Sequence, residues 1–275
     1  MIIVQIIQKN LETPLSKRAT VTGYIIDNSP EIDENRTRPA IVICPGGGFN
    51  VVSAREGEPI AVQMLARGFQ AFVLDYSLAP ARFPTQLLEL AEAVKIIRQH
   101  ANEWHVNPDQ IVAAGFSAGG HIAAGLGTLW HSELFEEYGY NAADIKPNGL
   151  LLGYSVLTAG KYAHRGSMVN LLGDDFKDEK KRAFQSLEDH VDEKTPKAFM
   201  WTTFTDQAVP MENTLLFAEA LRRHNVDFEL HIFPTGSHGL SLGSEESQKK
   251  DNPANVQPEV QVWPDLFATW VKNQI

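Results

Sequence analysis

The sequence predicts an α/β protein with a mostly parallel sheet of about eight strands and helices on both faces. Short apolar runs alternate with helix-like segments along most of the 275 residues, a pattern typical of parallel strands joined by helical crossovers. Residues 40–44 and 149–153 are almost wholly apolar and of strand length, which indicates buried strands. The sequence contains no repeat and no interdomain linker, so we expect one domain over residues 1–275.

The first half of the chain is expected to supply an antiparallel edge and the centre of the sheet. Gly68 follows one helical segment as its C-cap, and apolar residues recur at steps of three and four after Pro84, which predicts one face of a helix. That face consists of Leu87, Leu90, Ala91, Val94, Ile97, Ala101 and Trp104. The expected elements before it are strands over 1–8, 21–27 and 40–44, a helix over 58–67, and a strand over 70–75.

The second half is expected to complete the sheet. Pro210 suits the first position of a helix, and apolar residues alternate from Val226 to Ile232 as in a half-buried strand. The expected strands are 111–114, 149–153, 198–204 and 226–232, with helices beginning near Gly120 and Pro210 and a closing helix around Trp263 to Val271.

Two segments interrupt this alternation. Residues 155–196 are polar and charged and follow the sixth expected strand, so we expect a small insertion over the sheet and a candidate lid. Residues 240–258 are rich in Ser, Glu, Gln, Lys, Asn and Pro and read as a mobile loop.

Composition excludes several functions. The net charge is −10 and no block of Lys or Arg occurs, which argues against a broad nucleic-acid-binding face. Cys44 is the only cysteine, so no intrachain disulfide forms. The start of the chain reads as a strand rather than a secretion signal. Residues 111–130 are weakly polar, but they contain Ser117, His121, Thr128 and five glycines, which favours a buried strand, turn and helix over a membrane span. We therefore expect a cytoplasmic protein without membrane or nucleic-acid partners, and homo-oligomer formation stays open.

The most informative motif is Gly115-Phe116-Ser117-Ala118-Gly119, which lies between an apolar strand and a helical segment. In a G-x-S-x-G elbow, small neighbours give the strained turn room and the serine hydroxyl is held clear of the sheet. Ser117 is therefore the candidate nucleophile for attack on a carbonyl. The alternative is a small-residue turn in an ordinary crossover.

The base and the acid are sought on loops that follow late strands. His238 lies just past the strand ending near Phe233, and Asp206 directly follows the strand over 198–204. Proteins with such an elbow order the groups as serine, acid, histidine along the chain, and this order holds here. The histidine would carry the proton and the aspartate would orient it. A solvated loop histidine and a helix-capping aspartate are the alternative interpretations.

An oxyanion site needs backbone N–H donors. The residue after the nucleophile, Ala118, is one candidate. Gly46-Gly47-Gly48 follows the third strand and could turn its amides toward a ligand. The sequence contains no P-loop, no EF-hand spacing and no zinc-pair spacing, so we expect neither a cofactor nor a metal.

Together these motifs resemble the α/β-hydrolase superfamily, over residues 40–239 or so. They are most similar to the hormone-sensitive-lipase-like and the bacterial feruloyl/acetyl-xylan-esterase-like groups. The resemblance rests on Pro45-Gly46-Gly47-Gly48-Phe49, Asp75-Tyr76-Ser77-Leu78-Ala79-Pro80, the Ser117 elbow, Asp206 before Val209-Pro210, and Ser237-His238-Gly239.

The chain departs from hormone-sensitive-lipase-like enzymes at two positions: Pro45 stands where a histidine is usual, and Ser77 where an arginine is frequent. Those enzymes also carry a larger N-terminal cap. The resemblance thus favours the feruloyl/acetyl-xylan-esterase-like branch and implies a serine esterase for short-acyl or carbohydrate-linked esters. It also implies Gly47, Gly48 and Ala118 as oxyanion donors. A serine peptidase of the prolyl-oligopeptidase type and a non-catalytic binding protein with the same fold are the alternatives.

Overall fold

The computed structural model describes residues 4–250 and 252–275. Within them the chain forms one eight-stranded sheet in the order β1-β2-β4-β3-β5-β6-β7-β8. β1 and β2 pair antiparallel to their neighbours, and all other pairs are parallel. The strands are β1 Val4–Asn10, β2 Thr20–Ile26, β3 Arg38–Cys44, β4 Gln70–Asp75, β5 Val106–Phe116, β6 Gly149–Gly153, β7 Ala198–Thr203 and β8 Phe228–Phe233.

These strands confirm the expected architecture and its antiparallel edge. The first expected strand began at residue 1, and residues 1–3 lie outside the described part of the chain. The strands over 70–75 and 149–153 have the predicted bounds. Both strands lie inside the sheet, where helices cover both faces. Side chains on either side of such a strand are buried, so the strand is rich in apolar residues.

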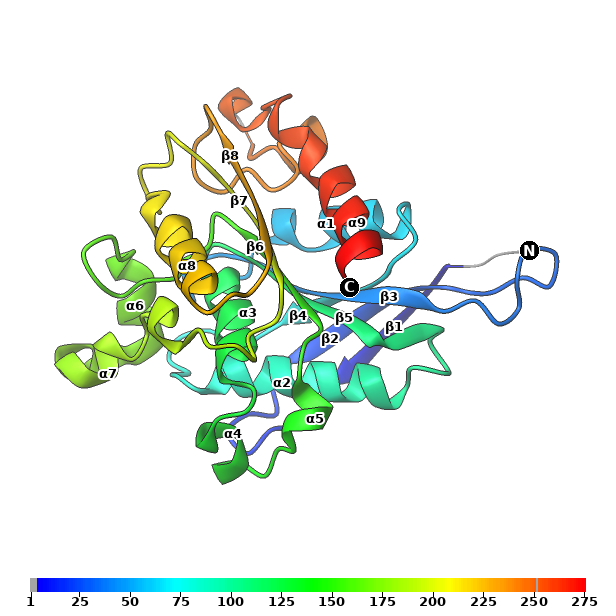
Figure 1. The fold of residues 1–275 in the computed structure, drawn as a ribbon, viewed down its shortest axis with the longest axis horizontal. Coiled ribbons are helices and arrows are strands. Elements are labelled where there is room, and N and C mark those ends of the chain that lie inside the picture. Colours follow the sequence, from blue (N-terminus) through cyan, green and yellow to red (C-terminus); the bar gives the residue numbers. More distant parts are fainter. Residues whose placement is uncertain (1–3, 251) are drawn as a thin grey trace.

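Helices cover both faces of the sheet (Figure 1). Along β3, Val42 packs into the core under α2 (Thr85–Gln99), α3 (Ala118–Leu129) and α8 (Glu212–Arg223). Ile41 and Ile43 point the other way and pack under α1 (Glu58–Leu65) and α9 (Trp263–Gln274). The alternation of side chains along a strand thus divides one apolar segment between two cores.

Some predicted bounds were wrong. α2 ends at Gln99, yet Ala101 and Trp104 remain buried because the turn after the helix keeps them against the same core. β5 begins at Val106 rather than at residue 111, and its pairing with β3 shifts register between Arg38 and Ala40. Two short helices before β6 were not expected, α4 (Glu133–Glu137) and α5 (Ala142–Ile145).

The insertion over 155–196 connects β6 to β7. It contains α6 (Arg165–Leu172), α7 (Glu179–Ala183) and two 3₁₀ helices, η2 (Gly173–Lys177) and η3 (Leu187–His190). Its α6 is attached to the glycine loop after β3, because the Asn170 side-chain amide donates to the Gly48 carbonyl at 2.8 Å.

The later segment over 240–258 is a loop, as expected, with two 3₁₀ turns, η4 (Glu245–Ser247) and η5 (Pro253–Asn255). Its first residues, Leu240 to Leu242, are buried. None of the helices in the described residues combines the length and the apolar character needed to cross a bilayer.

The parallel topology determines where functional side chains can meet. β3, β5, β6, β7 and β8 run in one direction, so their carboxyl ends share one edge of the sheet. Ligands of open α/β sheets bind at that edge. The glycine loop, Ser117, Asp206 and His238 all lie on connections that leave this edge.

Candidate active site

Ser117 lies at the sharp turn between β5 and α3. Its φ of 54° and ψ of −120° place it in a backbone region that residues other than glycine seldom adopt. Its N–H donates to the Gly153 carbonyl of β6 at 3.1 Å, which fixes the turn against the neighbouring strand. The predicted strand–turn–helix setting of the elbow is thus present.

The glycines around Ser117 are required by close backbone contacts. A Cβ on Gly115 would lie 2.2 Å from the Gly119 carbonyl oxygen, and a Cβ on Gly119 would lie 2.0 Å from the Cys44 carbonyl oxygen. These distances are far below van der Waals contact, so the elbow packs onto the end of β3 only with glycine at both positions. This packing brings Ser117 beside the glycine loop.

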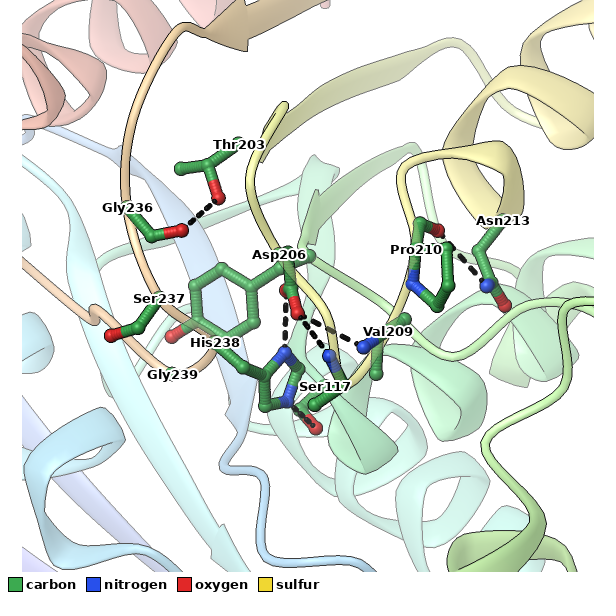
Figure 2. A network of polar contacts seen from close by, with 12 residues as sticks. Ser117, Thr203, Asp206, Val209, Pro210, Asn213, Gly236, Ser237, His238 and Gly239 are labelled. Carbon is green, nitrogen blue, oxygen red and sulfur yellow. Dashed lines mark hydrogen bonds and ion pairs between the residues drawn. The ribbon is translucent and has the colours of Figure 1, made fainter.

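Ser117, His238 and Asp206 form one continuous hydrogen-bonded chain. Figure 2 shows the imidazole between the hydroxyl and the carboxylate. The His238 Nε2 lies 2.7 Å from the Ser117 Oγ, and the His238 Nδ1 lies 2.7 Å from the Asp206 Oδ2. An ionised carboxylate only accepts, so Nδ1 carries the proton and Nε2 is free to accept from the serine.

The aspartate is held in place by its own loop. Asp206 is 3% exposed, and its Oδ1 accepts from the Ala208 N–H at 2.9 Å. The same oxygen accepts from the Val209 N–H at 3.0 Å (Figure 2). These two bonds leave Oδ2 for the imidazole. The alternative interpretation as a helix-capping residue was wrong, because Met211 is the N-cap of α8 and the bonds of Oδ1 stay within the loop before that helix.

The glycine loop, which we call the oxyanion loop and define as residues 46–48, has its carbonyls all occupied. Gly46 accepts from Ser53, Gly47 accepts from Asn50 and Val51, and Gly48 accepts from Asn170. The Gly46 N–H donates to Glu56.

Among the described residues, the N–H groups of Gly47, Gly48 and Ala118 have no acceptor. Gly47 and Gly48 lie on the wall of the cavity that contains Ser117, and Ala118 opens α3 directly after it. All three predicted donors are thus placed around the serine with their hydrogen-bonding capacity unused.

A cavity of about 880 Å³ opens over Ser117 and His238. Apolar atoms contribute much of its wall, and five loops add amide, hydroxyl and charged side chains. The side chains on this wall that the sequence did not indicate include Arg55, Glu56, His164, Gln207, Lys249, Asn252 and Asn255.

His164 is the second imidazole in this cavity and comes from the insertion, just before α6. Its Nδ1 accepts from the Ser167 N–H at 3.2 Å. Burial and the neighbouring His238 lower the pKa of His164, while Asp206 acts in the opposite direction. A neutral ring with Nδ1 occupied presents Nε2–H as a donor.

His121, by contrast, is a buried packing residue of α3. It is 4% exposed, and its nitrogens contact the Val156 carbonyl at 3.2 Å and the Gln185 side chain at 3.1 Å.

Sequence reasoning missed Glu56, on the wall of this cavity, and Tyr154, which packs against His238. Glu56 is buried although it belongs to a polar run, and no motif marks it. Tyr154 follows β6 at a φ of 36° and packs its ring edge-on against His238, at 5.2 Å between ring centroids. The only sequence signal for Tyr154 is its place directly after a buried strand, at the edge of the sheet where Ser117 also lies.

Comparison with known proteins agrees with this fold. An endo-1,4-beta-xylanase B of Butyrivibrio fibrisolvens is 36% identical over 215 residues, which cover 76% of this chain and 33% of that protein. An acetylxylan esterase of Xylanibacter ruminicola is 28% identical over 218 residues, 78% of this chain and 43% of that protein. The chain thus spans between a third and a half of the length of these relatives.

A solved structure covers nearly the whole chain. The carboxylesterase Cest-2923 from Lactobacillus plantarum WCFS1 superposes with a TM-score of 0.88 at 30% identity, over 98% of both chains. The sequence model of the BD-FAE family matches residues 28–221, most of the chain and all but one of the predicted site residues. The protein therefore belongs to the BD-FAE family of α/β-hydrolase esterases, which are related to the feruloyl/acetyl-xylan-esterase-like and hormone-sensitive-lipase-like groups.

Proposed function

We propose that this protein is a carboxylic ester hydrolase in which Ser117 is the nucleophile, His238 the general base and acid, and Asp206 the residue that orients the imidazole. The observation that carries the proposal is the continuous chain of two 2.7 Å contacts from the Ser117 hydroxyl to the Asp206 carboxylate, at the wall of an open cavity. These are the contacts that serine activation requires.

The first half-reaction forms an acyl-serine. The Ser117 Oγ attacks the ester carbonyl while its proton passes to the His238 Nε2, and the carbonyl oxygen becomes an oxyanion. The N–H groups of Gly47, Gly48 and Ala118 donate to that oxyanion. As the tetrahedral intermediate collapses, the Nε2 proton passes to the departing alkoxide, and the alcohol leaves. Asp206 stays ionised and stabilises the imidazolium.

The second half-reaction repeats these steps with water. His238 takes a proton from a water molecule, whose oxygen attacks the acyl-serine and forms a second oxyanion in the same place. The Ser117 alkoxide then leaves with the Nε2 proton, which regenerates the hydroxyl and releases the carboxylic acid. The net change is hydrolysis of one ester bond, and no cofactor or metal takes part.

The substrates we propose are short-acyl or carbohydrate-linked esters. The cavity is wide, and its wall offers the side chains of Gln207, Ser237 and Asn252 to a hydroxylated alcohol. The relatives named for xylan and acetylxylan support the same class. The cytoplasmic location stays a prediction from the sequence.

The test is hydrolysis of p-nitrophenyl acetate by the wild type, by Ser117→Ala and by the control Ser132→Ala. We expect Ser117→Ala to lose at least about 1000-fold in kcat, since nothing else in the site can form the acyl intermediate. Ser132 caps a surface turn after α3, and its variant should keep wild-type kinetics. Equal rates in wild type and Ser117→Ala would contradict the proposal.

The substrate class is tested by matched series. With p-nitrophenyl esters of two, four and eight carbons, we expect kcat/KM to fall with acyl length. An acetylated xylo-oligosaccharide should be deacetylated with a lower KM than p-nitrophenyl acetate. Faster cleavage of an aminoacyl-p-nitroanilide than of any ester would support the peptidase alternative instead.

A further inference from the structure

We propose that Glu56 and Tyr154 are positioning residues of this reaction, which hold the oxyanion loop and the loop carrying His238 at a fixed separation around Ser117. The inference rests on the proposed ester hydrolysis and adds two residues to it. The loop carrying His238, residues 236–241, is called the histidine loop below.

Glu56 is a buried carboxylate whose two oxygens each contact a different element. It lies at the end of the 3₁₀ helix η1 (Ala54–Glu56) and is 3% exposed. Its Oε2 accepts from the Gly46 N–H at 2.7 Å, and its Oε1 accepts from the Tyr154 hydroxyl at 2.7 Å. One side chain therefore joins the start of the oxyanion loop to the end of β6.

Tyr154 continues this connection to the histidine loop. Its hydroxyl accepts from the Ser241 N–H at 2.9 Å while it donates to Glu56. Burial and the adjacent Glu56 raise the pKa of Tyr154 well above its usual range, so the phenol stays a donor. Its ring contacts the imidazole of His238 edge-on, and its N–H donates to the Trp201 carbonyl at 2.7 Å.

The far end of the connection is equally well anchored. Ser241 is fully buried and all its polar groups are bonded: N–H to Tyr154, Oγ to the Arg55 carbonyl at 2.6 Å, and its carbonyl to the Trp263 indole at 3.0 Å. Arg55 in turn donates to the Gly239 carbonyl at 2.8 Å. Arg55 and Glu56 thus reach the histidine loop by two separate routes.

The glycines of the oxyanion loop explain why an external restraint matters. Glycine backbones can adopt many conformations, so the direction of the Gly47 and Gly48 N–H groups depends on what holds the loop. The bond from the Gly46 N–H to Glu56 is the only one among the described residues that fixes a donor of this loop. Misplacing an oxyanion donor or the imidazole weakens interactions made in the transition state more than those made with bound substrate.

The proposal is tested with Tyr154→Phe and Glu56→Gln. Phenylalanine keeps the ring against His238 but lacks the hydroxyl that donates to Glu56 and accepts from the Ser241 N–H. Glutamine keeps the shape of Glu56 but has one accepting oxygen for two donors. The matched controls are Tyr138→Phe and Glu58→Gln; Tyr138 follows the peripheral α4, and Glu58 is exposed.

Active sites are counted by titration with a fluorophosphonate, so that misfolded protein does not enter the rates. We expect kcat per titrated site to fall about 10- to 100-fold in both variants, while KM for p-nitrophenyl acetate changes less than about threefold. The Ki of an alkylboronic acid, whose tetrahedral adduct on Ser117 places an oxygen at the oxyanion position, should rise by the same factor as kcat falls.

Loss of folded protein alone would reduce the titre and leave per-site kcat and the boronate Ki unchanged. The proposal is therefore overturned if the per-site kcat and the boronate Ki of Tyr154→Phe match those of the controls. If Tyr154→Phe does not fold, the same comparison is made with Glu56→Gln. It is also overturned if KM alone rises. An active Ser117→Ala protein would overturn the proposed function instead, so the two failures are distinguished.

Discussion

At the scale of single residues, the elbow depends on backbone contacts that a methyl group would break. Gly119 approaches the Cys44 and Pro45 carbonyl oxygens so closely that an added Cβ would lie 2.0 and 2.5 Å from them. Because both are backbone atoms, the end of β3 and the oxyanion loop would have to move. We expect Gly119→Ala to destabilise the fold by about 3 kcal/mol or more, despite the better helix propensity of alanine.

Gly125 in the same helix is the matched control. Its added Cβ would meet only the Leu87 Cδ1, at 3.3 Å, and this side-chain atom can yield. The gain in helix propensity then offsets the contact, so Gly125→Ala should change the free energy of unfolding by less than about 1 kcal/mol. Urea denaturation of both variants measures the difference, and equal midpoints would contradict the packing argument.

The residues of the site differ in how far the sequence could predict them. Ser117 carries a motif, and the chain order of the elbow fold then limits the choice of Asp206 and His238. Glu56 and Tyr154 carry no such signal, because their roles arise from burial and from contacts between residues distant in sequence. Glu56 contacts Gly46, which is 10 residues away, and Tyr154, which is 98 residues away. Local patterns cannot indicate that a glutamate in a polar run is buried.

At the scale of elements, α6 connects the insertion to the oxyanion loop. We propose that residues 155–196 serve as a lid that is docked at this point, since Asn170 binds the Gly48 carbonyl and His164 lies on the cavity wall. Asn170→Ala removes the donor to Gly48, and one hydrogen bond is typically worth about 1 kcal/mol. We expect kcat for p-nitrophenyl acetate to fall about fivefold, with little change in the thermal midpoint.

Val169→Ala is the control for this prediction, because Val169 is an exposed neighbour on the same helix. It should leave kcat at the wild-type value. If both variants reduce kcat equally, the effect belongs to the helix in general and the contact with Gly48 has no separate role.

The bounds of the elements show where pattern reading fails. β6 was predicted correctly because a strand covered on both faces must be apolar from end to end. α2 was predicted too long because Ala101 and Trp104 keep the apolar period after the helix has ended. The first five residues of β5 were missed, since Val106-Asn107-Pro108-Asp109-Gln110 is mostly polar and pairs with β3 only across a register shift.

At the scale of the whole molecule, a buried histidine couples stability to pH. His121 connects α3 to the insertion through the Val156 carbonyl and Gln185, and burial lowers its pKa, although both hydrogen bonds act in the opposite direction. In the unfolded chain the pKa returns to about 6.5. Between the lowered pKa and 6.5, the unfolded state therefore binds more protons than the folded state.

The sign of the effect follows from this difference. The contribution of His121 to stability is fully present above about pH 6.5 and is lost as the pH falls through the pKa of the folded protein. His121→Gln cannot bind the proton, so the free energy of unfolding should fall less between pH 7.5 and 5.5 than in the wild type. The carboxylates titrate in both proteins, so their contribution cancels in the difference between the two changes in the free energy of unfolding.

Urea denaturation at several pH values measures the two slopes, and His224→Gln supplies the control because His224 is exposed at the end of α8. That variant should keep the wild-type slope. Protonation would place a charge in this buried contact between α3 and the insertion, so the same experiment reports the desolvation cost of that charge. A wild-type slope in His121→Gln would show that this buried contact does not couple stability to pH through protonation.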